Sequence, residues 1–149
     1  MITVFLPCRL GSQRVPNKNI KTFSGIEGGL LKIKLDQLCR AKRVDSIVVS
    51  SNDPRVLDIA SQYSDNRIII DERPDQLGSD TTTTDELIQY VPTIILEGQI
   101  LWTHVTSPFL NESDYDGIIE SYFKSLDSGY DSLMTVSTLQ GFIWDKDEP

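Results

Sequence analysis

The residues best suited to chemistry lie in a short basic loop near the N-terminus. Arg9, Arg14 and Lys18 stand close together there, and such cations neutralise phosphate oxygens, which an arginine can bind two at a time. Between them, Gly11 and Ser12 would let backbone N–H groups approach a phosphate closely. The segment fits neither common phosphate-loop pattern, GxxxxGK[ST] or GxGxxG. It predicts a site for a small polyanion such as a nucleoside triphosphate, although such a loop can also simply connect two elements in solvent.

The charge of the whole chain makes this loop stand out. The 149 residues include 22 acidic and 14 basic side chains, which give a formal net charge of −8 at pH 7. The first acidic residue is Glu27, and it follows four cations. A net negative charge argues against a general nucleic-acid-binding protein. A basic segment on an acidic chain instead favours a small, highly charged ligand.

The composition is that of an ordinary water-soluble domain, with 39% hydrophobic and 24% charged residues. No apolar run approaches the roughly 20 residues of a membrane-spanning helix. The apolar start, Met1–Leu6, is short and lacks a preceding basic region, so it does not resemble a signal peptide. Two cysteines, Cys8 and Cys39, are too few for a disulfide framework or a metal cluster. A reducing cytoplasm is therefore the expected location.

Five short runs rich in Val, Ile and Leu have the length and composition of β-strands. They are Ile2–Leu6, Ser46–Ser50, Arg67–Ile70, Ile100–His104 and Ser132–Val136. Near-continuous apolar runs are typical of parallel strands that are covered on both faces.

Helical patterns lie between these runs. Their inward-facing positions are Leu31, Leu35 and Leu38, then Val56, Ile59, Ala60 and Tyr63, then Leu87 and Val91, and finally Tyr115, Ile118, Ile119, Tyr122 and Leu126. Asp53 before Pro54 predicts one helix start, and the pair Asn111 and Asp114 resembles a capping box at another. A third helix is expected to open within Asp80–Thr84. Pro92 is expected to end or kink it.

Strands that alternate with helices predict a doubly wound α/β fold with a mostly parallel sheet. In such sheets, ligands bind outside the carboxyl ends of the strands. The rule selects four loops: Pro7–Lys21, Ser50–Asp53, Asp71–Thr84 and Val105–Asn111.

Three segments in these loops together resemble the acylneuraminate (CMP-sialic acid) cytidylyltransferase family. The first runs Arg-x-Gly-Ser-x-Arg-x-Pro-x-Lys-Asn from Arg9 to Asn19, the second is Arg73-Pro74 with Leu77–Thr81, and the third is Thr106–Phe109. The resemblance implies a Rossmann-like, three-layer nucleotide-diphospho-sugar transferase fold. It also implies that residues 1–149 form a single nucleotidyltransferase domain that lacks the family's C-terminal portion, where the arm that pairs two subunits into a homodimer and the metal site lie.

The resemblance implies a reaction in which a sugar hydroxyl attacks the α-phosphate of CTP and pyrophosphate leaves, with Mg²⁺ as cofactor. Carried over by motif, Arg9, Ser12 and Lys18 hold the triphosphate, and Arg9 and Lys18 also stabilise the developing charge. Asn19, Arg73, Thr82 and Thr84 line the nucleoside site; the metal ligands are unknown. For Thr82 and Thr84 the other interpretation is helix capping, and for Arg73 it is a surface ion pair.

His104 departs from the family pattern, which usually has glutamine at this position in the strand before Thr-Ser-Pro. That glutamine resembles a sugar contact, so the resemblance implies that His104 binds the substrate sugar. The chain has no other histidine. A structural histidine and a general base are the other interpretations.

The function expected from the resemblance is the activation of a sialic-acid-like nonulosonic sugar. One alternative is a cytidylyltransferase for another sugar acid, legionaminic, pseudaminic or 3-deoxy-octulosonic. A second is a non-catalytic nucleotide-binding fragment, and a third is a structural α/β interaction module.

Overall fold

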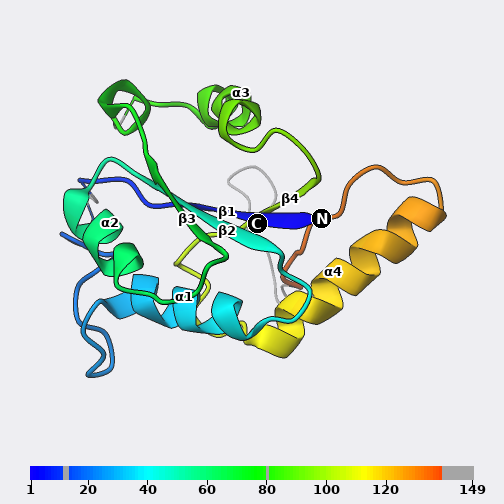
Figure 1. Cartoon of the computed structure of the whole chain (residues 1–149), viewed down its shortest axis with the longest axis horizontal. Coiled ribbons are helices and arrows are strands. Elements are labelled where there is room, and N and C mark those ends of the chain that lie inside the picture. Colours follow the sequence, from blue (N-terminus) through cyan, green and yellow to red (C-terminus); the bar gives the residue numbers. More distant parts are fainter. Residues whose placement is uncertain (12–13, 80, 139–149) are drawn as a thin grey trace, which may run out of the picture. The chain divides into compact units, whose positions relative to one another are not determined.

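A computed structural model describes residues 1–11, 14–79 and 81–138 (Figure 1). Its four strands are β1 (Ile2–Pro7), β2 (Ser46–Ser51), β3 (Ile68–Glu72) and β4 (Gln99–Trp102). They form one sheet in the order β3-β2-β1-β4, in which every neighbouring pair is parallel. The predicted α/β class and parallel sheet are confirmed.

Four α-helices connect or follow these strands: α1 (Gly29–Arg40), α2 (Pro54–Ser61), α3 (Thr84–Ile94) and α4 (Glu112–Asp127). A short 3₁₀ helix, η1 (Asp75–Leu77), lies between β3 and α3. The chain divides into two compact units, Met1–Ile119 and Glu120–Pro149, and the whole sheet belongs to the first. The single-domain organisation stays a prediction. None of the helices in the described part has the length and apolarity needed to cross a bilayer.

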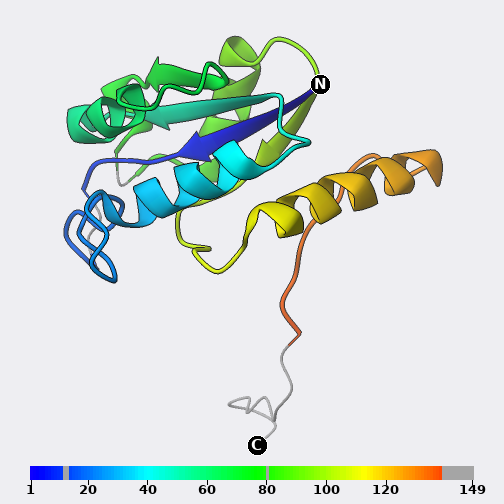
Figure 2. The ribbon, with the colours of Figure 1, turned by 60° about the horizontal axis from the view of Figure 1, so that its bottom comes forward.

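The sheet separates two apolar clusters, with α3 on one side and α1 and α2 on the other (Figures 1 and 2). Alternate residues of β1 supply the two sides, because successive side chains of a strand point to opposite faces. Val4 and Leu6 join the larger cluster, which includes Leu31, Leu35, Leu38, Val56, Ala60, Tyr115 and Ile119. Phe5 and Val48 pack with Val91, Ile95 and Trp102 in the smaller cluster.

The prediction that the strands are covered on both faces is wrong for the two outer strands. Ile69 of β3 and Ile100 of β4 are 51% and 42% exposed. They pair in register with Val48 and Thr3. In the described part of the chain α3 is the helix that covers this face. Its buried residue Val91 and the following Ile95 lie over the centre of the sheet.

The predicted strand Ser132–Val136 is also wrong, because the structure assigns no strand there. Met134 and Val136 are 82% and 79% exposed. A β-strand forms only where a neighbouring strand accepts and donates its backbone hydrogen bonds. Residues 132–136 have no such pairing with the described sheet.

The structure confirms the helix caps predicted at Asp53 and Asn111. Asp53 accepts a hydrogen bond from the backbone N–H of Arg55 and caps α2, with Pro54 as its first residue. Asn111 and Asp114 each accept the other's backbone N–H, at 3.1 and 2.8 Å, which confirms the capping box before α4. Helix α3 starts within the predicted stretch and continues two residues past Pro92 to Ile94.

Gly25, before α1, and Gly29, the first residue of α1, offer a matched test of the segment that leads into this helix. Both have positive φ, +53° at Gly29 and +77° at Gly25, but a Cβ on Gly29 would lie 2.1 Å from the carbonyl oxygen of Lys21, whereas one on Gly25 would meet nothing within 4 Å. Gly25→Ala is expected to lower the free energy of unfolding by about 1 kcal/mol, the cost of the left-handed backbone alone. Gly29→Ala should cost about 3 kcal/mol or more. Urea denaturation followed by circular dichroism measures both, and equal losses would contradict the close contact.

Candidate functional site

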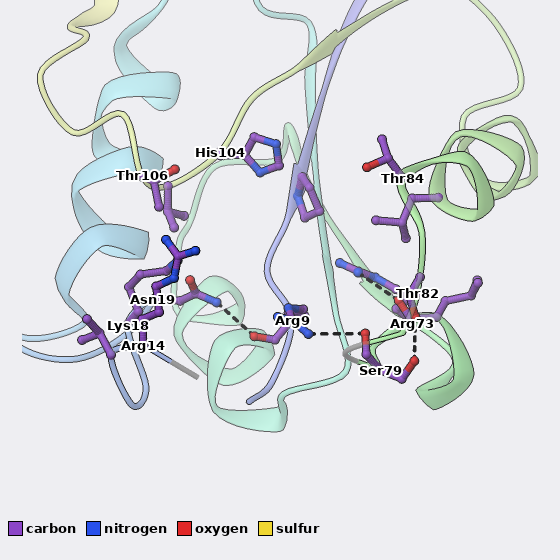
Figure 3. Close-up of a pocket in the computed structure, with 15 residues that line it drawn as sticks. Arg9, Arg14, Lys18, Asn19, Arg73, Ser79, Thr82, Thr84, His104 and Thr106 are labelled. Atoms are coloured by element: carbon purple, nitrogen blue, oxygen red, sulfur yellow. Dashed lines mark hydrogen bonds between the residues drawn. The ribbon is translucent and has the colours of Figure 1, made fainter. Parts of the chain in front are cut away.

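A cavity of about 830 Å³ opens at the carboxyl ends of the strands (Figure 3). The site residues predicted from sequence that line it are Arg9, Lys18, Asn19, Arg73, Thr82, Thr84 and His104. They come from the segments after β1, β3 and β4 and from the start of α3. Ser12, the remaining predicted site residue, lies outside the described residues. The structure therefore brings together side chains that are up to 95 positions apart, from Arg9 to His104.

The position of the cavity follows from the strand order. From β1 the chain moves to β2 and β3 on one side, and then crosses to β4 on the other. The loops that leave β1 and β4 therefore diverge, which creates the crevice where doubly wound sheets bind ligands. Arg9 follows β1 and His104 follows β4, and both line the cavity.

The basic loop is tied down by its own polar groups. The Asn19 side chain donates to the carbonyl oxygen of Arg9 at 3.2 Å, and the Asn19 carbonyl accepts from Leu31 at 2.8 Å. Arg9 reaches across the cavity, where its guanidinium donates to the carbonyl oxygen of Ser79 at 3.3 Å. Asn19 thus lines the cavity and also fixes the loop that carries Arg9.

Arg73 is buried, with 3% of its surface exposed. Its guanidinium donates to the hydroxyl and the carbonyl oxygen of Ser50, at 3.0 and 2.5 Å, and to the carbonyl oxygen of Leu77 at 3.4 Å. The alternative of a surface ion pair is therefore wrong. Burial lowers the pKa of Arg73. A cation that is bonded only to neutral oxygens at the cavity wall is well placed to attract an anion.

The threonines at the start of α3, Thr82 to Thr84, have separate roles. Thr83 caps the helix in a capping box with Glu86, so the alternative that Thr82 or Thr84 caps it is wrong. The Thr82 hydroxyl donates to the carbonyl oxygen of Gln76 and contacts the Ser79 hydroxyl, each at 3.0 Å. Thr84 and Thr82 both reach the cavity, where their hydroxyls can donate to or accept from a nucleoside.

His104 contacts a tryptophan two residues back. The Trp102 indole N–H donates to Nε2 of His104 at 3.1 Å. Enclosure in the cavity wall lowers the pKa of His104, and the positive charge of Lys18 lowers it further. Both effects favour the neutral form of the ring.

Two side chains of α1 hold the loop after β4 by hydrogen bonds. Lys34 is completely buried, and its ammonium donates to the carbonyl oxygen of Ser107 at 2.7 Å and to the Tyr115 hydroxyl at 2.5 Å. One turn later, Gln37 donates to the carbonyl oxygen of Pro108 at 2.8 Å. These bonds fix the position of the loop after β4. The earlier residues of this loop, His104 to Thr106, line the cavity.

The charge inside the cavity is opposite to that of the whole chain. Four cations line it, Arg9, Arg14, Lys18 and Arg73, and the described lining residues include no carboxylate. Charges of one sign in a concave, partly enclosed space strengthen the field felt by a ligand. The cavity suits a ligand with several negative charges, such as a triphosphate.

The same donor set does not fit a metal ion held by the protein. Mg²⁺ is usually bound through one or two carboxylates together with substrate phosphates. Within residues 1–11, 14–79 and 81–138, no group of three or more His, Cys, Asp or Glu side chains could hold a metal.

Sequence reasoning did not single out Ser79, Thr106 or Leu87 as site residues, although all three line the cavity. Ser79 and Thr106 belong to the second and third motifs, so their position was a usable signal. Leu87 was assigned to the core from its spacing. It lies in the first turn of α3, the end of the helix that faces the cavity.

The two cysteines are free thiols, and Cys8, directly after β1, is buried. Burial raises its pKa to about 12, against the opposing effect of Arg73. In a Cys39→Ser variant, Cys8 is therefore expected to react with a disulfide reagent at pH 8 only when urea unfolds the chain, because the thiolate is the reactive form. Absorbance of the released thiol measures this. Rapid reaction of the folded variant would contradict the burial of Cys8.

The chain is similar to known proteins in sequence and in fold. A family profile described as cytidylyltransferase matches residues 3–147. The chain is 24% identical over 138 residues to 3-deoxy-manno-octulosonate cytidylyltransferase 2 of Hydrogenovibrio crunogenus, which covers 91% of this chain and 51% of that protein. It is 25% identical over 125 residues to pseudaminic acid cytidylyltransferase of Campylobacter jejuni, covering 80% of this chain and 52% of that protein.

Among solved structures, the fold resembles a CMP:2-keto-3-deoxy-manno-octonic acid synthetase complexed with CTP, with a TM-score of 0.64 and 17% identity over 84% of this chain and 48% of that one. It also resembles a cytidylyltransferase from Leptospira borgpetersenii, with a TM-score of 0.63 and 17% identity over 83% of this chain and 49% of that one. The chain thus spans about half the length of the relatives it matches. Because the family profile matches residues 3–147 of this chain, the chain belongs to the cytidylyltransferase family.

Proposed function

We propose that this chain carries the CTP site of an enzyme that activates a sialic-acid-like nonulosonic sugar to its CMP derivative, of the N-acylneuraminate type. One observation carries the proposal: a cavity at the crossover point of the sheet that has four cations and no carboxylate among its described lining residues. Membership in the cytidylyltransferase family supports CTP as the nucleotide. Relatives whose names specify sugar acids support a sugar acid as the second substrate.

In the proposed reaction, the anomeric hydroxyl oxygen of the sugar bonds to the α-phosphorus of CTP. The bond to the bridging oxygen of the β-phosphate breaks, pyrophosphate leaves with that electron pair, and the hydroxyl proton passes to water. Such transfers depend on positioning and on neutralisation of charge. Arg9 and Lys18 would neutralise the triphosphate and the leaving pyrophosphate. Asn19, Arg73, Thr82 and Thr84 would hold the nucleoside, and His104 would contact the sugar.

Mg²⁺ belongs to this proposal as the counter-ion of CTP, the form in which a nucleoside triphosphate usually binds. No step is assigned to it, because the described lining residues offer no carboxylate to hold it. The two free thiols favour a reducing compartment, the cytoplasm, as the site of the reaction. Pairing of two subunits into a homodimer is part of the same proposal.

A second candidate is a cytidylyltransferase for another sugar acid. The similarity to a 3-deoxy-manno-octulosonate enzyme and to a pseudaminic acid enzyme is nearly equal, at 24% and 25% identity. A panel with N-acetylneuraminate, legionaminate, pseudaminate and 3-deoxy-manno-octulosonate as substrates would rank these sugars by kcat/KM.

The deciding experiment combines pyrophosphate release from CTP, Mg²⁺ and each sugar with a CTP-induced thermal shift. Release with N-acetylneuraminate supports the proposal, and release only with another sugar supports the second candidate. A shift without release would indicate a nucleotide-binding fragment, a third candidate that is motivated by the half-length match to the relatives. The absence of both pyrophosphate release and a thermal shift would overturn the assignment to CTP.

A further inference from the structure

The hydrogen bond between Trp102 and His104 defines the protonation of the histidine ring. An indole N–H can only donate, so the nitrogen that receives it, Nε2 of His104, must offer a lone pair. The distance between the two nitrogens is 3.1 Å. A neutral imidazole has one N–H and one lone pair. With Nε2 as the acceptor, the proton lies on Nδ1.

The indole is well placed to impose this state. Trp102 packs edge-on against Phe5, with ring centroids 4.8 Å apart and planes at 72°. It also belongs to the apolar cluster with Val91 and Ile95 beneath α3. The ring centroids of the indole and the imidazole lie 6.3 Å apart, with their planes at 55°. A ring held by this packing cannot easily turn its N–H away.

Protonation of His104 would place an N–H at Nε2 directly against the indole N–H of Trp102. The cationic ring carries a proton on both nitrogens, so the bond from Trp102 would be lost. The charged group that acts on His104 from across the cavity, Lys18, opposes the positive ring as well. Both effects keep the ring neutral with a donor at Nδ1.

From this geometry we propose that Trp102 is a positioning residue, which holds His104 as the Nδ1–H tautomer so that the ring offers a donor to an acceptor oxygen of the sugar acid. This rests on the proposed function for the identity of the ligand. Because the lone pair of Nε2 is engaged by Trp102, the ring has no free basic nitrogen, and His104 is not the general base. The oxygen it selects is that of a carboxylate or carbonyl group, next to the positive charge of Lys18.

The first test needs no turnover. The chain contains one histidine, so a long-range ¹H–¹⁵N spectrum of the folded protein reports His104 alone. We expect Nδ1 to appear as the protonated nitrogen in the wild type. In Trp102→Phe, which keeps an aromatic ring against Phe5 but has no N–H, the pKa of His104 should rise and the population should move toward Nε2–H. Nε2–H in the wild type, or identical spectra and titrations in both proteins, would overturn the proposal.

The second test separates donation from size and packing. Glutamine and methionine at position 104 are similar in length and both uncharged, but only glutamine carries a donor. We expect His104→Met to raise KM for the sugar by about 10-fold or more relative to His104→Gln, with similar Kd values for CTP. Equal KM values would overturn the donor role. A lack of turnover in the wild type would instead count against the proposed function, and the spectra would still decide the tautomer.

Discussion

Replacement of Lys18 by alanine is expected to raise the Kd for CTP by about 10- to 100-fold, which corresponds to loss of one charge-assisted bond to a phosphate. Lys18 is half-buried in the cavity wall, close enough to His104 to lower the pKa of that ring. No ion pair between Lys18 and a carboxylate is found among the described residues. Its charge is thus available to a triphosphate, and isothermal titration calorimetry measures the loss.

Lys21 supplies the matched control. It lies in the same loop and carries the same charge, but it does not line the cavity. Lys21→Ala should leave the Kd within about 2-fold, because an exposed charge outside the cavity is screened by salt. The effect of Lys18→Ala should also shrink when CMP replaces CTP, since CMP lacks the outer phosphates. Equal losses for the two lysines would show that general attraction, and not the cavity, binds the nucleotide.

The fold could be predicted because its signals are local. The apolar runs and the caps at Asp53 and Asn111 each concern a few neighbouring residues, and they place the strands and helices of the Met1–Ile119 unit. Ser132–Val136 shows where this reasoning stops. Its composition favours a strand, but a strand also needs a partner, and partner availability is not a property of the segment itself.

The site could be predicted in outline, because three of the four loops that the strand-end rule selects contribute residues to the cavity wall, whereas Ser50–Asp53 contributes none of the described lining residues. What each side chain does within it depends on contacts between distant segments. Arg73 bonds to Ser50, 23 positions away, and thus becomes part of the wall. The Trp102–His104 pair is the exception. In the predicted strand Ile100–His104 these two residues would share a face, so the sequence contained that signal, although the observed strand β4 ends at Trp102.

The burial of Lys34 could not be predicted from the sequence. It stands among Leu31, Leu35 and Leu38 on α1, where a lysine would be expected to reach solvent. In the structure it is completely buried and bonds to Ser107 and Tyr115. Burial lowers its pKa from the ordinary 10.5 to about 8. The hydrogen bonds go to neutral oxygens, so they do not fully replace the lost hydration of the ammonium.

This shift predicts a pH dependence of stability that a single substitution can isolate. Between pH 8 and 10.5 the unfolded chain keeps the Lys34 proton and the folded chain releases it, so the unfolded state binds more protons and stability rises with pH. From pH 7 to 9.5 the wild type should gain about 2 kcal/mol of unfolding free energy relative to Lys34→Met. Lys32→Met, which removes a half-exposed ammonium two residues away on the same helix, should follow the wild type. Urea unfolding at several pH values measures all three.

The difference between variants is the informative quantity, because other groups oppose Lys34 in the same range. Burial raises the pKa of Cys8 to about 12 and that of Cys39 to about 11, both from an ordinary 9.0. Above pH 9 the unfolded thiols ionise before the folded ones, which lowers stability as pH rises. Both thiols are present in the wild type and in Lys34→Met, so their effect cancels in the comparison. A constant difference between the two proteins from pH 7 to 9.5 would mean that water reaches the Lys34 ammonium, and that the anchor beneath the Ser107 loop is weaker than its geometry indicates.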